Sequence, residues 1–339
     1  MSTGKPLRCM DPSASWAEIA AQAIFHTLVA SLFIEALVRS WRVAEPLQRM
    51  ALRLVALGYP LVVIPALLSL FPFRLEEPFH DGAALLVGRR WSEVRLAGMP
   101  LFDLWLGGFA LVGALLFAMD VVPLLRGRRR PRPEPAAPDA ASAAVLSELP
   151  ALAAALGITS PPPVEFLARD APVLFCNGIR RHAIVVSRGA VRLLDRDELR
   201  AALAHELAHL ARHDPAVSWV VMAARALMWF NPAFQVLSRA VARDAEWLAD
   251  ERAATVCGDR LALASGLLKL HRATAGAAPV RRTLPLAGAL AEPLARVRSL
   301  DVEVRCRRLL DGPPAPLPYL KARVAIAAGS LTAMLFFVV

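Results

Sequence analysis

Long, uninterrupted apolar stretches alternate with polar segments along this chain. A bilayer core of about 30 Å takes roughly 20 helical residues to cross, and four stretches are long enough. We predict membrane-spanning helices over residues 17–38, 51–71, 101–125 and 319–339. Between the third and fourth of these, shorter apolar runs and helical periodicity indicate a folded domain outside the bilayer.

The segment between the third and fourth predicted spans divides into a linker and a domain. Residues 131–142 read PRPEPAAPDAAS, a composition typical of an extended linker. Residues 143–317 then form the predicted domain, which we place in the cytosol. The predicted fold class is therefore a mainly α membrane protein, with three transmembrane helices within residues 1–130, a cytosolic α+β domain, and a fourth transmembrane helix.

Within the domain, the order of short and long periodic segments predicts strands before helices. An Ala/Leu-rich helix is predicted over residues 143–156, ended by Gly157. Apolar runs at 164–167, 171–176 and 182–187 predict three strands, the last two forming a hairpin around Asn177-Gly178. From Asp195 onward the pattern is helical.

Composition and charge support a membrane protein and suggest its orientation. Hydrophobic residues make up 56% of the chain and charged residues 20%, against about 45–50% and about 25% in typical soluble domains, and the mean hydropathy is +0.46. The net charge of +10 could indicate nucleic acid or an anionic membrane surface as partner. Basic residues gather beside the predicted spans, at Arg39, Arg42 and Arg49, at Arg126, Arg128, Arg129, Arg130 and Arg132, and at Lys321 and Arg323.

All three basic clusters lie in the cytosol if the N-terminus lies outside, as the positive-inside rule requires. We therefore predict a multi-pass membrane protein with its N-terminus outside. The basic run after the third span is expected to contact anionic lipid, and no direct nucleic-acid partner is expected. Cys9, Cys176, Cys257 and Cys306 form no CxxC pair, which argues against a cysteine-based zinc site.

The segment LDRDELRAALAHELAHLARHDP carries the clearest chemical signal. Asp195 and Glu198 have the spacing of a capping box, which predicts the start of a helix. Four residues separate His205 from His209, so both imidazoles share one helix face and can hold one ion. Glu206 lies between them, turned by about 100°. This HExxH pattern supplies two zinc ligands and a carboxylate that can act as general base for water.

A catalytic zinc also needs a third protein ligand. His213 lies eight residues from His205, about 12 Å along a helix, which is too far for two imidazoles that share one ion. Glu246 is the better candidate, because it should lie on a helix with Asp250 one turn later. Asp250 could then accept the second N–H of a ligand histidine. The alternative for this segment is a solvated acidic helix face.

Three motifs in order, HELAH, then WFNP at Trp229–Pro232, then EWLADERAA at Glu246–Ala254, resemble the BlaR/MecR-type membrane zinc metallopeptidases. The resemblance implies an outside N-terminus, three spans, a cytosolic gluzincin domain and a fourth span. It also implies one zinc ion bound by His205, His209 and Glu246, with Glu206 as general base and Asp250 supporting a ligand histidine. The ExxxD pattern is shared with HtpX-type and CAAX-prenyl proteases, whereas WFNP and the three preceding spans favour BlaR/MecR.

By this resemblance, the leading hypothesis is a membrane-embedded zinc endopeptidase that cleaves a cytosolic or membrane-adjacent protein. Antibiotic-sensing members of the family act on a cytosolic transcriptional repressor, which suggests regulated signalling here by analogy. Those members carry a penicillin-sensor domain after the fourth span, and none is expected here because the sequence ends at Val339. The alternatives are an HtpX-like quality-control protease, or a non-proteolytic signalling module with a structural zinc.

Residues 216–230 are apolar enough to resemble a short fifth span. A crossing there would put Glu246 and His205 on opposite sides of the membrane, so a fifth span and the zinc site exclude each other. Because the segment is short and Arg225 lies in its middle, we expect a buried or membrane-surface helix instead.

Two further features of the domain stay open at this point. Arg252 and His271 are candidates for stabilising the transition state, or else ordinary surface residues. The strand over residues 182–187 either pairs with an extended substrate by β-addition or is only an edge strand.

Overall fold

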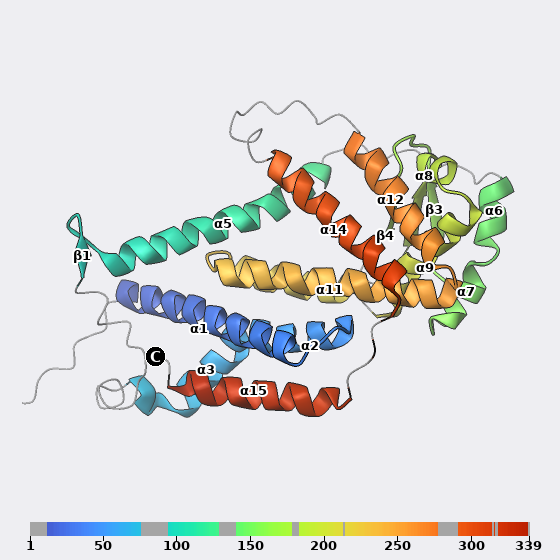
Figure 1. Ribbon diagram of the computed structural model, residues 1–339. Helices are drawn as coiled ribbons and strands as arrows, with labels where there is room; N and C mark the ends of the chain where they lie inside the picture. The colour runs from blue at the N-terminus through green and yellow to red at the C-terminus, as the bar shows by residue number, and fades with distance from the viewer. Residues whose placement is uncertain are drawn as a thin grey trace, which may run out of the picture. The chain divides into compact units, whose positions relative to one another are not determined.

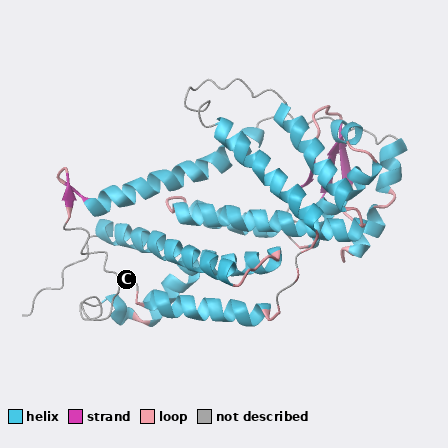
Figure 2. Cartoon of the chain, viewed as in Figure 1, coloured by secondary structure: helices cyan, strands magenta, loops and turns pink. Residues whose placement is uncertain are grey.

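The computed structural model describes residues 12–75, 94–128, 140–177, 183–212, 214–276, 291–313, 315 and 318–337 (Figure 1). The chain is mainly helical, as predicted (Figure 2), and it divides into two compact units. The first unit comprises Met1–Arg129, Val221–Ala242 and Pro316–Val339, and the second comprises Arg130–Val220 and Arg243–Ala315. The second unit therefore lacks residues 221–242, which the sequence-based boundaries of 143–317 include.

The first unit is built from helices with one small hairpin. Its elements are α1 (Pro12–Ser40), α2 (Pro46–Gly58), a π-helix (Tyr59–Val63), α3 (Ile64–Leu70), a 3-10 helix (Pro72–Leu75), β1 (Arg95–Leu96), β2 (Met99–Pro100), α5 (Leu101–Arg128) and α15 (Leu320–Phe336). Two of these helices are long and apolar enough to cross a membrane. They are α1, over Ile19–Ser40, and α5, over Asp103–Val122.

The predicted span over residues 51–71 is not one continuous α-helix. Its α-helical turns give way to a π-helix at Tyr59–Val63 and resume at Ile64. Pro60 and Pro65 explain the change, because a proline lacks the backbone N–H and its ring clashes with the preceding turn. A π-turn is one way for a helix to accommodate such a defect. The fourth predicted span corresponds to the 17-residue α15.

The core of the first unit lies between α1, α2 and α15, which pack side by side (Figure 1). Ile34, Leu52 and Leu331, one from each of these helices, are almost completely buried. The beginning of α11 (Pro232–Cys257) adds Phe234, Leu237 and Val241 to the same apolar cluster. Part of the helix that carries ExxxD thus belongs to the core of the first unit.

The second unit combines a three-stranded sheet with helices. Its elements are α6 (Ala140–Leu146), α7 (Leu149–Ala155), β3 (Val164–Leu167), β4 (Leu174–Asn177), β5 (Ala183–Ser187), α8 (Arg188–Leu193), α9 (Arg196–Ala211), α12 (Arg260–Gly276) and α14 (Ala291–Asp311). Both α10 (Asp214–Leu227) and α11 begin or end in the first unit. The helix predicted over residues 143–156 is divided into α6 and α7 by a turn at Ser147 and Glu148, because Pro150 in the first turn of α7 disfavours helix in the residue before it.

The sheet has the order β3-β5-β4, with β5 parallel to β3 and antiparallel to β4. The predicted hairpin of the last two strands is confirmed. The expectation that the strand over residues 182–187 pairs with substrate or forms an edge is wrong, because both sides of β5 are occupied by neighbouring strands. The edges of the described sheet are β3 and β4, and β4 contacts α9.

The predicted capping box at the start of α9 is confirmed. Asp195 Oδ1 accepts the backbone N–H of Glu198 at 2.9 Å, and Glu198 Oε2 accepts that of Asp195 at 3.0 Å. The buried Glu198 carboxylate also accepts hydrogen bonds from Ser265 Oγ at 2.5 Å and Lys269 Nζ at 2.6 Å on α12. These contacts fix the first turn of α9, so the face of the helix two turns later is held in a defined direction.

A tight corner between β5 and α8 leads into α9, and it depends on Gly189. A Cβ atom at this position would lie 1.9 Å from the carbonyl oxygen of Asp170. We expect Gly189→Ala to lower the free energy of unfolding by about 1–3 kcal/mol, because a well-packed corner must shift to admit the methyl group. Thermal unfolding of the purified protein checks this. Gly266→Ala on α12 is the matched control, since a Cβ there would meet Glu198 only at 3.5 Å.

Candidate metal centre

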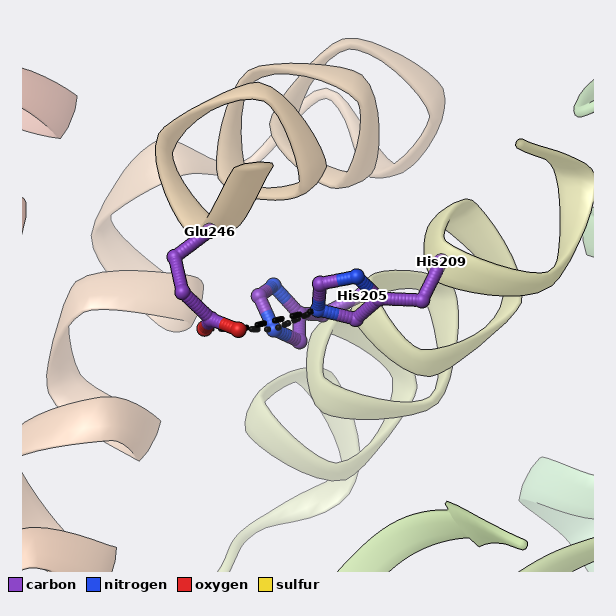
Figure 3. Close-up of side chains that lie close together, drawn as sticks. All are labelled: His205, His209 and Glu246. Carbon is purple, nitrogen blue, oxygen red and sulfur yellow. Dashed lines mark hydrogen bonds and ion pairs between the residues drawn. The ribbon is translucent and has the colours of Figure 1, made fainter. Parts of the chain in front are cut away.

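The helices α9 and α11 bring together three side chains of the second unit that have metal-binding atoms. His205 and His209 lie one turn apart on α9, and Glu246 faces them from α11 (Figure 3). Each residue offers one ligand atom, and these atoms lie within 4.8 Å of one another. His205 is buried and the other two side chains are half-buried. The structure thus brings together the three residues that the sequence and the family resemblance select.

The spacing of the three ligand atoms suits a tetrahedral ion. His205 Nε2 lies 3.1 Å from His209 Nε2 and 3.6 Å from Glu246 Oε2, and His209 Nε2 lies 3.4 Å from Glu246 Oε1. Ligands placed about 2.0–2.2 Å from one tetrahedral zinc are about 3.3–3.6 Å apart. Two imidazoles and one carboxylate also match the donor set of a catalytic zinc site, which keeps its fourth position for water or substrate.

Asp250 lies where the sequence predicts it, one turn beyond Glu246 on the same face of α11. Its Oδ1 is 3.0 Å from Nδ1 of His205. An imidazole whose Nδ1 faces a carboxylate carries its proton there, which leaves Nε2 free to bind a metal. Asp250 is therefore placed to orient His205 toward the ligand cluster.

Arg305 on α14 completes the charged group, a role that the sequence does not predict. Its Nε and Nη2 donate to the two carboxylate oxygens of Asp250, both at 2.7 Å, and its Nη1 lies 3.1 Å from Oε2 of Glu246. One planar guanidinium thus holds two carboxylates one turn apart on α11. No motif marks this arginine, which lies 55 residues from Asp250 on a helix rich in arginine.

Charges in this group stabilise one another despite their burial. Burial opposes ionisation of Glu246, but His205 and Arg305 hold the pKa of its carboxyl well below the usual range. The pKa of Asp250 is lowered in the same way, chiefly by Arg305 against the effect of burial. For His205, burial works against the proton, yet Asp250 and Glu246 raise its pKa to about 10. Both carboxylates therefore stay ionised at neutral pH, where they face the Arg305 guanidinium and a protonated His205 whose Nε2 proton a bound metal would replace.

Glu206 lies beside the cluster and is held by the edge strand of the sheet. Its Oε2 accepts the backbone N–H of Cys176 on β4 at 2.8 Å. Burial raises the pKa of the Glu206 carboxyl, although the neighbouring histidines oppose this. The thiol of Cys176 has its pKa raised to about 11 by burial and by Glu206, so it remains protonated. A carboxylate with a raised pKa next to a metal site suits a general base.

The remaining residues considered from sequence do not belong to the ligand cluster. Arg252 is exposed on α11, and His271 is half-buried on α12. Their assignment as transition-state stabilisers stays a prediction. His213 lies outside the described residues.

The family described as BlaR1 peptidase M56 matches residues 99–291, which is more than half of the chain. The matched range includes the three metal-binding residues but not Arg305. The chain belongs to this peptidase family. The resemblance to BlaR/MecR-type peptidases, stated from the HELAH, WFNP and EWLADERAA motifs, is thereby confirmed.

Individual relatives carry the name of a second group of proteases, the HtpX homologs. The chain is 31% identical over 147 residues to a protease HtpX homolog of Pyrococcus furiosus, which covers 33% of this chain and 51% of the relative. A protease HtpX homolog of Burkholderia multivorans is also 31% identical over 147 residues, covering 34% and 52%. The chain thus spans about half the length of the curated relatives it matches.

Proposed function

We propose that this protein is a zinc-dependent membrane endopeptidase that hydrolyses peptide bonds of a cytosolic or membrane-adjacent protein. The observation that carries this proposal is the cluster of His205, His209 and Glu246, spaced for one tetrahedral ion, with Glu206 beside it. Membership of a peptidase family supports the same activity. A site built only to stabilise the fold would have no use for Glu206 as a base.

The chain's own residues divide the proposed reaction between them. When bound, zinc supplies a Lewis acid that polarises a peptide carbonyl and acidifies water. Glu206 takes the proton from the attacking water and passes it to the departing amine nitrogen. The Cys176 N–H fixes one oxygen of that carboxylate, which leaves the other free to exchange the proton. Asp250 and Arg305 hold His205 and Glu246 in place.

The edge strand β4 is the part of the sheet that suits an extended substrate. Its Cys176 N–H points at Glu206 rather than at β5, so the edge of β4 that faces away from β5 faces the proposed catalytic base. An extended peptide that adds to this edge would place its backbone next to Glu206. This replaces β5 as the candidate for substrate pairing.

We further propose the membrane arrangement that the basic clusters indicate. α1 and α5 are the two helices that qualify as spans among the described residues, and the interrupted segment α2–α3 and the 17-residue α15 are proposed as the other two. With the N-terminus outside, the zinc site lies on the cytosolic side of a bacterial inner membrane. A protein substrate and anionic lipid are the proposed partners.

Two physiological roles remain to be separated, and each has its own support. The BlaR1 family match favours regulated signalling, such as cleavage of a transcriptional repressor. The relatives named HtpX favour an HtpX-like quality-control protease instead. A signalling peptidase should produce few new N-termini in cells, whereas quality control should produce many, drawn from damaged membrane proteins.

Metal analysis of the purified protein tests the proposed site directly. We expect one zinc per chain in the wild type and its loss in His209→Ala, because two protein ligands hold zinc far less tightly than three. His271→Ala is the matched histidine control and should keep the full zinc content. Equal zinc content in wild type and His209→Ala would contradict the site.

A further inference from the structure

The segment Val221–Ala242 belongs to a different compact unit from the residues on either side of it. Val220 before it and Arg243 after it both belong to the second unit, while the segment itself belongs to the first. It consists of the end of α10, a turn at residues 228–231, and the beginning of α11. The chain therefore passes from the second unit into the first and then returns to the second unit.

The turn packs against the middle of a candidate membrane span. A Cβ atom on Gly113 of α5 would lie 2.6 Å from the carbonyl carbon of Phe230 and 2.7 Å from the carbonyl oxygen of Trp229. Gly113 is about ten residues, or about 15 Å, from each end of the span Asp103–Val122. Only a residue without a side chain permits this approach, so the depth of the turn beside α5 is fixed.

Ion pairs place the end of α10 and the beginning of α11 near the end of the same span. Asp120 of α5 accepts hydrogen bonds from Arg225 on α10 and, at 3.0 Å, from Arg239 on α11. Arg239 also donates to the carbonyl oxygen of Leu116 at 2.7 Å. About eleven helical residues of α11, from Pro232 to Ala242, span about 16 Å, which is half of a bilayer core.

Two buried amide side chains satisfy backbone groups at and beside the turn. The Nδ2 of Asn231 donates to the carbonyl oxygen of Ala23 at 3.0 Å and to Thr27 Oγ1 at 2.9 Å on α1, and its Oδ1 accepts the Phe234 N–H at 3.1 Å. The Nε2 of Gln235 donates to the carbonyl oxygens of Arg225 and Met228. Both amide side chains are fully buried. Irregular backbone at membrane depth is tolerated only where the protein satisfies it in this way.

The outer face of the same segment is apolar and exposed. Leu227 is 65% exposed, Val236 57% and Trp229 46%. On α5, Leu111 beside Gly113 is 62% exposed as well. Exposed apolar side chains at the depth of a membrane span require lipid around them, since water would be an unfavourable neighbour.

We propose that residues 221–242 form a re-entrant hairpin that dips to about the middle of the bilayer and presents Leu227, Trp229 and Val236 to lipid acyl chains. The hairpin explains how an apolar segment between HExxH and ExxxD leaves His205 and Glu246 on the same side of the membrane. The proposal rests on the proposed membrane placement of α5, and it is independent of the peptidase chemistry.

Spin labels on single cysteines in the full-length protein test the hairpin in phospholipid bilayers. All four native cysteines are first replaced by serine, and Leu227→Cys, Leu111→Cys and Thr255→Cys then each carry one nitroxide. We expect collisions with lipid-soluble oxygen to dominate at Leu227 and Leu111, and collisions with a water-soluble nickel chelate to dominate at Thr255, which is exposed on the last turns of α11. An impermeant maleimide should react with Glu165→Cys and Thr255→Cys from one and the same face of the bilayer.

Each alternative result of these measurements contradicts a different part of the proposal. Nickel collisions at Leu227 with oxygen collisions at Leu111 would overturn the hairpin alone. Nickel collisions at both positions would overturn the membrane placement of α5 together with the hairpin. Reaction of Glu165→Cys and Thr255→Cys from opposite faces would replace the hairpin by a spanning helix. None of these readouts depends on proteolysis, so a failure of the proposed peptidase activity is detected separately.

Discussion

Replacing Glu206 by glutamine is expected to reduce peptide-bond hydrolysis by about 10²–10⁴-fold while zinc stays bound. A general base typically contributes this much, and glutamine keeps the size of the side chain and an oxygen that can accept the Cys176 N–H. The three metal-binding side chains are untouched. The measurement compares newly formed protein N-termini in cells that express the wild type or Glu206→Gln, together with the zinc content of both purified proteins.

Glu165→Gln supplies the matched control, because Glu165 is an exposed carboxylate on β3 of the same unit. It should give the same new N-termini as the wild type. Fragments that persist unchanged in Glu206→Gln would exclude Glu206 as the base. If no new N-termini form in cells that express the wild type or in cells that express Glu206→Gln, and zinc is bound to both purified proteins, the signalling module with a structural zinc is favoured.

Arg305→Met is expected to lower the free energy of unfolding by about 3–5 kcal/mol. Removing one partner of a buried ion pair leaves the other charges uncompensated, and here a single guanidinium contacts both Asp250 and Glu246. A bound cation compensates part of this charge. The loss should therefore be larger in protein treated with a chelator than in zinc-loaded protein, and thermal unfolding in the two conditions measures the difference.

Arg307→Met is the control on the same helix. It tests whether the loss of any arginine from this helix would lower the free energy of unfolding as much. Arg307 is 73% exposed and pairs with the exposed Glu303 at 3.1 Å, so its loss should change stability by no more than about 1 kcal/mol. If Arg305→Met were no more damaging than Arg307→Met, the proposed role of Arg305 in holding the two carboxylates would be wrong.

Features that depend on neighbouring residues were predictable from the sequence. The capping box of Asp195 and Glu198 follows from their spacing, and the shared face of His205 and His209 follows from the helical repeat. Pro150 marks the break before α7, although the Ala/Leu-rich pattern around it predicts one continuous helix. The π-helix at Tyr59–Val63 has the same origin, in Pro60 and Pro65.

Features that depend on distant segments were not predictable from local patterns. Sheet order is set by which strands meet, so nothing within residues 182–187 shows that β5 is central. The helical spacing of Glu246 and Asp250 makes Glu246 a candidate ligand, but only the family resemblance favours that role over a solvated acidic helix face. Arg305 carries no motif, and Arg225 read as a charge that argues against a span, whereas it binds Asp120 of α5 and Gln235 of α11.

The positions of the metal-binding residues along the chain have a consequence for chain entropy. His209 precedes residues 221–242 and Glu246 follows them, so an ion bound by both closes a loop of roughly 40 residues. A crosslink of that size restricts the unfolded chain by an amount worth about 4 kcal/mol in simple loop-closure models. Metal binding would therefore stabilise the whole enclosed loop as well as the site. Chelation should loosen a stretch of chain far longer than the three side chains that touch the ion.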